Sequence, residues 1–134
     1  MNTLTIIKTT SGYVFGGFVI SSWKRYGSYI ADDAAFIFSL LNPFNKPVKI
    51  EVTTSGYAIY SYYYSGPTFG NGHDFYIPDN FNESTSRTSL NNSYKIPGSL
   101  NISSNLLLVG SSSFIVSELE VYQLEGIKIL LFHI

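Results

Sequence analysis

Hydrophobic and polar residues alternate along much of this chain, and this period of two predicts β-strands. Val48, Ile50 and Val52 fall on one face of such a segment, with Lys49 and Glu51 on the other. Other segments are rich in the β-branched and aromatic residues that strands favour. We expect strands over residues 3–9, 13–20, 48–52, 58–64 and 75–77.

The first two of these strands are separated by Ser11-Gly12, a turn pair that predicts an antiparallel hairpin. Gly16 and Gly17 interrupt the second strand. Paired glycines inside a strand indicate either a bulge or the close approach of another part of the chain.

Residues 34–41 fit two structures. Phe36 and Phe38 would lie on one face of a strand and Ile37 on the other, so both faces would be buried. The preceding Asp32-Asp33 would also cap a helix. We favour a strand, because the run is short and aromatic and stops at Asn42-Pro43.

The second half of the chain is less regular. Residues 79–105 are crowded with Asn, Ser and Thr, which predicts a long surface loop. Further strands are expected over 106–109 and 114–124, with a bulge at Ser117-Glu118, where the apolar positions change face. We expect one domain over residues 1–126 and an apolar tail over 127–134, which is either a buried strand or a sticky end.

Glycines recur at Gly66, Gly70 and Gly72, directly before His73-Asp74. A phosphate-binding loop would end in Gly-Lys-Ser/Thr and open a helix, and this segment does neither. Adjacent residues on a strand point to opposite faces, so His73 and Asp74 would not act together on one substrate. No Gly-x-Ser-x-Gly motif supplies a nucleophile. Backbone geometry is the better account of the glycines.

Acidic side chains offer two further candidates. Glu118 and Glu120 fall on the same side of the last strand, as a general acid/base pair or a cation site would require, but such pairs more often lie on a solvated surface. An oxygen-rich stretch offers ligands for calcium, but its spacing does not match an EF-hand loop. That stretch comprises Asp74, Asp79, Asn80, Asn82 and Glu83.

Aromatic residues give a third kind of candidate. A tyrosine cluster spans Tyr57 to Tyr64. It would be either a platform on which sugars stack, or a sheet face with cross-strand aromatic pairs, and we favour the sheet face. Trp23, followed by Lys24-Arg25, would either anchor an interface or cover the core.

Composition narrows the function classes. The chain has 134 residues, 45% of them hydrophobic and 13% charged, and a formal net charge of −1, which indicates a packed domain and argues against nucleic-acid binding. It contains no cysteine, which excludes disulfides, thiolate metal ligands and a cysteine nucleophile. Neither a secretory signal nor an apolar run of about 18 residues is evident, so we expect a cytoplasmic protein without a membrane span.

Four sequence blocks occur in a fixed order. They are the strand, glycine and tryptophan pattern from Thr5 through Gly16-Gly17 and Trp23 to Leu40, the glycine-rich 66–75, the serine-rich 86–94, and 114–122. Together they resemble the TLDc domain family, and the Asn/Ser-rich style is most like TLDc proteins of protists. The resemblance covers about residues 4–124.

The resemblance implies an α+β fold, predominantly an antiparallel β-sandwich with few short helices. It also implies roles in oxidative-stress resistance and, for several members, binding and regulation of the vacuolar proton-pumping ATPase, with no established reaction. Family domains usually begin well upstream of the first recognisable strand. We therefore expect an N-terminally truncated domain whose uncovered sheet or apolar tail promotes self-association.

The leading hypothesis is a non-catalytic protein-interaction domain with no cofactor and no metal, whose suspected partners are vacuolar ATPase subunits. One alternative is a carbohydrate-binding β-sandwich that uses the tyrosine cluster; another is a hydrolase or peroxide-handling enzyme that uses His73. Asp74, Glu118 and Glu120 are expected on the exposed contact surface. The full set of interaction or family-motif residues is Gly16, Gly17, Trp23, Gly66, Gly70, Gly72, Asp74, Glu118 and Glu120.

Overall fold

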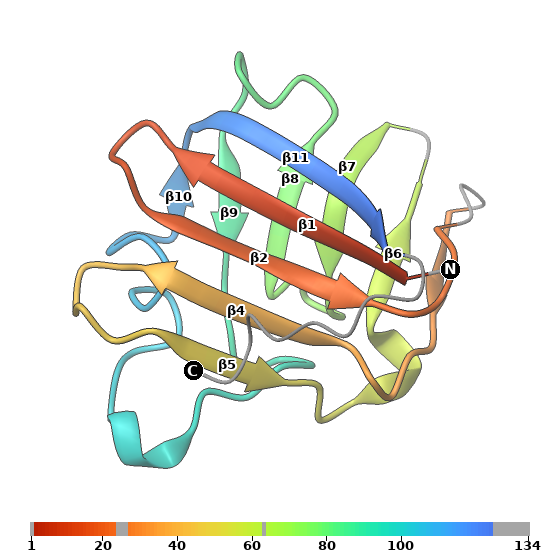
Figure 1. The fold of residues 1–134 in the computed structure, drawn as a ribbon, viewed down its shortest axis with the longest axis horizontal. Helices are drawn as coiled ribbons and strands as arrows, with labels where there is room; N and C mark the ends of the chain where they lie inside the picture. Colours follow the sequence, from red (N-terminus) through yellow and green to blue (C-terminus); the bar gives the residue numbers. More distant parts are fainter. Residues whose placement is uncertain (1, 24–26, 63, 125–134) are drawn as a thin grey trace.

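The computed structural model describes residues 2–23, 27–62 and 64–124, which form a sandwich of two antiparallel β-sheets (Figure 1). The expected fold class, a predominantly antiparallel β-sandwich with few short helices, is confirmed. The apolar segment 127–134, expected as a tail or terminal strand, lies outside the described residues, as do Lys24 and Arg25.

The first sheet has five strands in the order β11-β1-β2-β4-β5. The strand β1 pairs with β2 across the expected Ser11-Gly12 turn, and on its other side with β11, where Asn2 lies opposite Leu124. The first and last strands of the described chain are therefore neighbours. The bounds are β1 Asn2–Thr9, β2 Val14–Val19, β4 Phe36–Leu41, β5 Val48–Glu51 and β11 Val116–Leu124.

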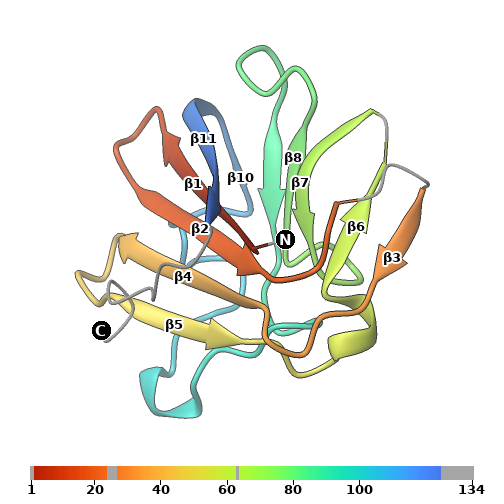
Figure 2. The ribbon, with the colours of Figure 1, turned by 45° about the vertical axis from the view of Figure 1, so that its right-hand side comes forward.

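The second sheet has six strands in the order β10-β9-β8-β7-β6-β3, and Figure 2 shows β6, β7 and β8 facing β1, β2 and β4 across the sandwich. The described helices are two short 3-10 helices, η1 (Ser55–Tyr57) and η2 (Gly98–Leu100). The strand bounds are β3 Ser28–Ile30, β6 Ile59–Ser61, β7 Ser65–Phe69, β8 Phe75–Pro78, β9 Ser86–Thr88 and β10 Ser113–Phe114.

The main core lies between the two sheets, because inward positions alternate along the strands with outward polar ones. The ring of Phe69 on β7 stacks on Phe75 of β8 with centroids 4.6 Å apart, and Phe15 of β2 meets Phe75 edge-on at 5.3 Å. Such aromatic pairs add stability beyond the area they bury. The strand β4 is apolar on both faces, as expected: Ile37 enters this core, and Phe36 joins a smaller cluster with Leu4, Phe18 and Phe38.

Close approach, and not a bulge, accounts for the paired glycines of β2. A Cβ atom on Gly17 would overlap the ring of Phe69, and one on Gly16 would overlap the backbone carbonyl of Thr5. The irregularity in the pairing of β2 with β4 falls elsewhere, between Val14 and Phe15. The absence of a side chain at Gly17 therefore lets the two sheets approach each other at Phe69.

The prediction of a surface loop over 79–105 is wrong in part. This segment contains β9 and η2, and it adds Leu90, Tyr94 and Ile96 to the core. Side chains supply hydrogen bonds to its backbone: for example, the side-chain oxygen of Asn91 accepts the amide of Ile96 at 2.8 Å. Asn and Ser serve here as internal hydrogen-bonding partners, which composition alone does not distinguish from solvation.

Of two further expectations, the strand over residues 106–109 is wrong and the bulge at Ser117-Glu118 is confirmed. Residues 106–109 form a turn and not a strand, closed by the hydrogen bond from the Gly110 amide to the Leu106 carbonyl at 2.8 Å. The bulge expected near Ser117-Glu118 is confirmed, because Lys8 pairs with Glu118 and Thr9 with Val116, leaving Ser117 unpaired in the ladder. The Ser117 hydroxyl donates to the carbonyls of Lys8 and Thr9, both at 3.2 Å.

Candidate functional site

The glycine-rich loop folds over a buried carboxylate. Asp74 is 0% exposed, so its expected place on an exposed contact surface is wrong. Its carboxylate accepts the backbone amides of Asn92, Ser93 and Tyr94 at 3.1, 2.9 and 3.1 Å. These three amide donors make the burial of the carboxylate possible, because a buried carboxylate needs hydrogen-bond partners. Asp74 therefore ties the loop to the segment that carries Tyr94.

The same loop has left-handed backbone at Gly70, Gly72 and His73, with φ of +89°, +91° and +59°. A Cβ atom on Gly70 would overlap the Asp74 carboxylate, so glycine is required there both for conformation and for space. Gly66 lies on β7, where an added Cβ would lie 2.9 Å from the Ile77 carbonyl oxygen. The glycines shape the chain around Asp74 and β8.

His73 and Asp74 face different surroundings. Burial raises the pKa of Asp74 to about 6, against the opposing effect of the backbone hydrogen bonds from Ser93, Tyr94 and Asn92. Burial, with a smaller effect from the Arg87 cation, lowers the pKa of His73. The His73 ring stacks on Tyr76 with centroids 5.5 Å apart, while the Asp74 carboxylate is occupied by amides, so the two do not form an acid–base pair.

His73 belongs to a continuous row of aromatic rings on the outer face of the second sheet, here called the aromatic ladder. Ile59 and Phe75 enter the core, so the next residues on their strands, Tyr60 and Tyr76, point outward. The members of the ladder are the rings of Tyr29, Tyr57, Tyr60, Tyr62, Tyr64, His73 and Tyr76, together with the guanidinium group of Arg87, which lies over Tyr76.

Neighbouring rings of the ladder are in contact along its whole length. The centroids of Tyr60 and Tyr62 lie 6.2 Å apart and those of Tyr60 and His73 lie 5.9 Å apart. At one end Tyr64 is 73% exposed, and at the other Arg87 lies 5.4 Å from the centroid of Tyr76. Tyr29 donates a hydrogen bond to Asn71 at 3.2 Å, and burial raises its pKa, with smaller effects from Tyr60 and Tyr57.

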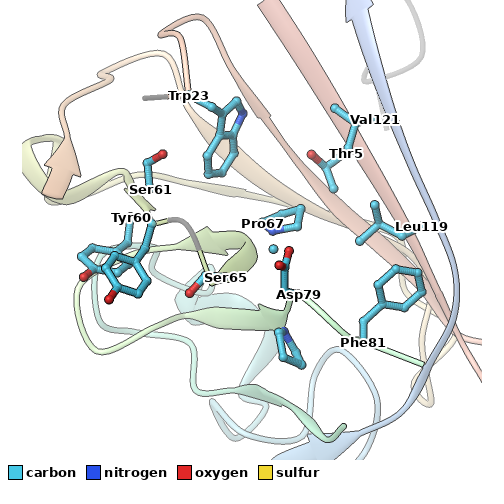
Figure 3. Close-up of a pocket in the computed structure, with 13 residues that line it drawn as sticks. Thr5, Trp23, Tyr60, Ser61, Ser65, Pro67, Asp79, Phe81, Leu119 and Val121 are labelled. Carbon is cyan, nitrogen blue, oxygen red and sulfur yellow. The ribbon is translucent and has the colours of Figure 1, made fainter. Parts of the chain in front are cut away.

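A cleft of about 380 Å³ opens between the sheets beside one end of this ladder. Figure 3 shows Trp23 on one side of it, Leu119 and Val121 of β11 on another, and the Asp79 side chain pointing into the space between them. The cleft is lined by Thr5, Trp23, Tyr60, Ser61, Tyr62, Ser65, Gly66, Pro67, Pro78, Asp79, Phe81, Leu119 and Val121.

Trp23 packs against the core, which is one of the two roles that its sequence position leaves open. Its indole N–H donates to the Thr3 hydroxyl at 3.1 Å, and its ring lies against Phe69 with centroids 5.8 Å apart. It therefore packs on the core and also contributes to the wall of the cleft.

Glu118 and Glu120 are both exposed on β11 and lie opposite Lys8 and Ile6 of β1. Glu120 accepts a short hydrogen bond from the Tyr122 hydroxyl, which raises the pKa of Tyr122. Among the described residues, no group of three or more His, Cys, Asp or Glu side chains is placed to hold a metal ion. Within the same residues, no helix has the length and apolar character that crossing a membrane requires.

A second depression, of about 380 Å³, lies beside His73 and Arg87. It is lined further by hydroxyl residues, including Ser89, Ser112 and Ser113. A serine beside a histidine is the arrangement that nucleophilic catalysis needs, provided that a hydrogen bond joins them. Within the described part of the chain, no such bond reaches the His73 ring.

A comparison with known protein families matches this chain to one of them. A family model for the TLDc domain matches residues 1–125 of the 134-residue chain. The chain belongs to the TLDc family. A search of functionally curated proteins found no match.

The candidate interaction and family-motif residues of this TLDc domain do not gather in one place. Trp23 and Gly66 line the cleft, and Glu118 and Glu120 lie on β11. Gly70, Gly72 and Asp74 belong to the glycine-rich loop, in which Gly70 and Asp74 are buried and Gly72 is exposed. Gly16 and Gly17 lie within the first sheet.

Sequence reasoning found the tyrosine cluster but missed the other members of the aromatic ladder. Tyr29, Tyr76 and Arg87 come from β3, β8 and β9. Tyr76 carried a signal, because it is the outward residue between the apolar Phe75 and Ile77. Tyr29 and Arg87 lie on three-residue strands, which are too short for alternation to reveal a face.

Proposed function

We propose that this TLDc domain is a non-catalytic protein-interaction domain that uses the aromatic ladder as its contact surface. The ladder carries the proposal, because tyrosine and arginine are enriched at protein interfaces: tyrosine gives contact area at a low entropic cost, and its hydroxyl supplies a hydrogen bond. Tyr62 and Tyr64 are exposed at one end of the ladder and Arg87 at the other.

The surroundings of His73 favour interaction over catalysis. Its ring packs between Tyr60 and Tyr76, at 5.9 and 5.5 Å, which gives it a structural role in the ladder. The neighbouring Asp74 carboxylate is turned into the core and bound by three amides. A general base needs a partner that orients it and a proton within reach, and the described residues around His73 provide packing instead.

For the partner we extend the family resemblance: a subunit of the vacuolar proton-pumping ATPase, with a cytoplasmic location and a link to oxidative-stress resistance. The match of the TLDc model over residues 1–125 supports this choice at the level of the family. The exposed ladder supplies a surface on which such a subunit would bind.

The test is affinity capture from a cytosolic extract, with the folded chain as bait and vacuolar ATPase subunits detected by mass spectrometry. A matched bait carries Tyr62→Ala and Tyr64→Ala, two exposed positions whose loss should leave the fold intact. We expect capture by the wild type and a strong reduction with the double variant. Absence of these subunits from the wild-type capture would contradict the partner, and equal capture by both baits would contradict the ladder as the contact surface.

Carbohydrate binding is the second candidate function, favoured by the exposure of Tyr62 and Tyr64. Sugars stack on free aromatic faces, and several faces in the ladder are already covered: Tyr60 stacks on Tyr62, with an interplanar angle of 25°, and His73 on Tyr76, with an angle of 15°. A glycan array probed with the wild type and the same double variant separates the two functions. Binding that disappears in the double variant would support the carbohydrate role.

A further inference from the structure

The cleft beside the ladder combines an apolar, aromatic lining with one acidic side chain. Its volume of about 380 Å³ is near the lower end of the range of about 300 to 1,000 Å³ for ligand pockets, so it suits one or two side chains. Trp23, Phe81, Leu119 and Val121 give it an apolar and aromatic lining. Among the described residues that line it, only Asp79 carries a charge.

The carboxylate of Asp79 lies where a ligand in the cleft would contact it. Figure 3 shows it pointing into the cleft, between Trp23 and Pro67 on one side and Phe81 on the other. Within the described residues, the salt bridge found joins Lys49 to Glu51 at 3.5 Å and does not involve Asp79. The cleft therefore presents one negative charge, framed by aromatic rings.

The geometry points to a binding site for an arginine side chain presented by a partner protein, an inference that rests on the proposed interaction function. The guanidinium group is planar and weakly hydrated, stacks on aromatic faces and pairs with a carboxylate through two parallel hydrogen bonds. Asp79 supplies the carboxylate, Trp23 and Phe81 the faces, and the aliphatic stem of the arginine would lie against Leu119 and Val121.

An arginine side chain fits the lining of the cleft better than a lysine side chain, a neutral sugar or an anionic ligand does. Lysine offers a compact, strongly hydrated charge that cannot use the rings and the carboxylate in one plane. A neutral sugar would donate hydroxyl hydrogen bonds to Asp79 but would not pair with its charge. A carboxylate or phosphate ligand would be repelled by that charge.

The single tryptophan of the chain provides a direct reporter. Because Trp23 lines the cleft, its indole N–H signal in a ¹⁵N NMR spectrum should shift when the cleft is occupied. The probes are three capped tripeptides, Gly-Arg-Gly, Gly-Lys-Gly and Gly-citrulline-Gly; citrulline keeps the shape of arginine without its charge. For one side chain we expect a dissociation constant of about 1 to 10 mM.

We expect saturable shifts of the Trp23 signal with the arginine peptide, and binding about tenfold weaker with the citrulline peptide. Asp79→Asn should remove this difference. The matched variant Glu118→Gln removes one exposed carboxylate from the opposite face of β11 and should preserve the difference. Retention of the preference in Asp79→Asn, or its equal loss in both variants, would overturn the arginine site. So would equal binding of lysine, no shift with the arginine peptide, or a shift produced instead by a neutral oligosaccharide.

Affinity capture then separates this inference from the proposed function. Capture of vacuolar ATPase subunits by the wild type but not by Asp79→Asn supports both. Equal capture by the two baits would overturn the arginine site and leave the interaction function standing. Failure of the wild type to capture any partner would contradict the proposed function, and the peptide titration would still decide whether the cleft binds arginine.

Discussion

The surroundings of Asp74 have two opposing effects on the pKa of its carboxyl group. Burial favours the neutral form, and the three amides of residues 92–94 favour the charged form. The balance raises the pKa to about 6 from an ordinary value of 3.8, so the folded state binds this proton more tightly than the unfolded state. The stabilising contribution of the neutral carboxyl is then fully present below about pH 3.8 and is lost as the pH rises through about 6.

We therefore expect the free energy of unfolding of the wild type, relative to Asp74→Ala, to fall between about pH 4 and pH 7. At about pH 5 the variant should lose about 3 kcal/mol, because three buried amides lose their acceptor. Urea unfolding at a series of pH values measures both quantities, with the exposed Asp79→Ala as the control. An NMR titration midpoint for Asp74 below about 4 would show that the amides outweigh burial.

A second residue-scale prediction concerns two buried serines. The Ser86 hydroxyl has no hydrogen-bond partner among the described residues, whereas the Ser93 hydroxyl accepts the amide of Asn71 at 2.9 Å. We expect Ser86→Ala to stabilise the fold by about 0.5 to 1 kcal/mol, since an unsatisfied buried hydroxyl is costly. Ser93→Ala should destabilise it by about 1 kcal/mol. Thermal or urea unfolding of both decides the matter, and a loss of stability in Ser86→Ala would contradict the prediction.

At the scale of elements, Gly17 sets the distance between β2 and β7. Because a Cβ atom there would overlap the Phe69 ring, we expect Gly17→Ala to destabilise the fold by about 2 to 3 kcal/mol. Gly56→Ala is the matched control, with no atom within 4 Å of its added Cβ. In a double-mutant cycle, Phe69→Leu should cost less in the Gly17→Ala background than in the wild type. Additive costs would show that the two residues do not interact.

Alternation along the sequence reveals a strand most clearly where the two faces of that strand have different surroundings. The alternation of β5 is visible because Val48 and Ile50 are buried and Lys49 and Glu51 are exposed. The strand β7 was missed because Gly66 and Pro67 are typical of loops; it tolerates them at a bulge between Ser65 and Thr68.

The segment carrying Tyr94 was missed for another reason. Its backbone bonds to distant groups and not to a long partner strand, as the amide of Tyr94 does with Asp74, 20 residues away. Tyr94 is fully buried, and its hydroxyl donates to the Ala58 carbonyl at 2.6 Å. Local patterns record neither kind of contact. The same limit applies to the cleft, whose walls come from β1, β6, β7, β8 and β11 and from the loop residues Trp23, Asp79 and Phe81.

At the scale of the whole molecule, surface and core make separable contributions. Tyr64 is 73% exposed, and the centroid of its ring lies 5.5 Å from that of Tyr62. Tyr64→Ala should therefore change the free energy of unfolding by less than about 0.5 kcal/mol. It should still weaken the capture of the partner. Tyr94→Phe, which loses a buried hydrogen bond, should cost about 1 to 2 kcal/mol and leave capture by the folded protein unchanged. Unfolding and capture measured on both variants test this, and the reverse pattern would be inconsistent with it.

The pairing of β1 with β11 affects how the chain folds while it is being synthesised. The hairpin of β1 and β2 can form early during synthesis, but the other side of β1 lacks its native partner until Leu124, which lies opposite Asn2, has left the ribosome. Until then β1 is an unpaired edge that other chains can join. The rate at which a ribosome synthesises the residues between β2 and β11 therefore sets how long the first strand is open to a wrong partner.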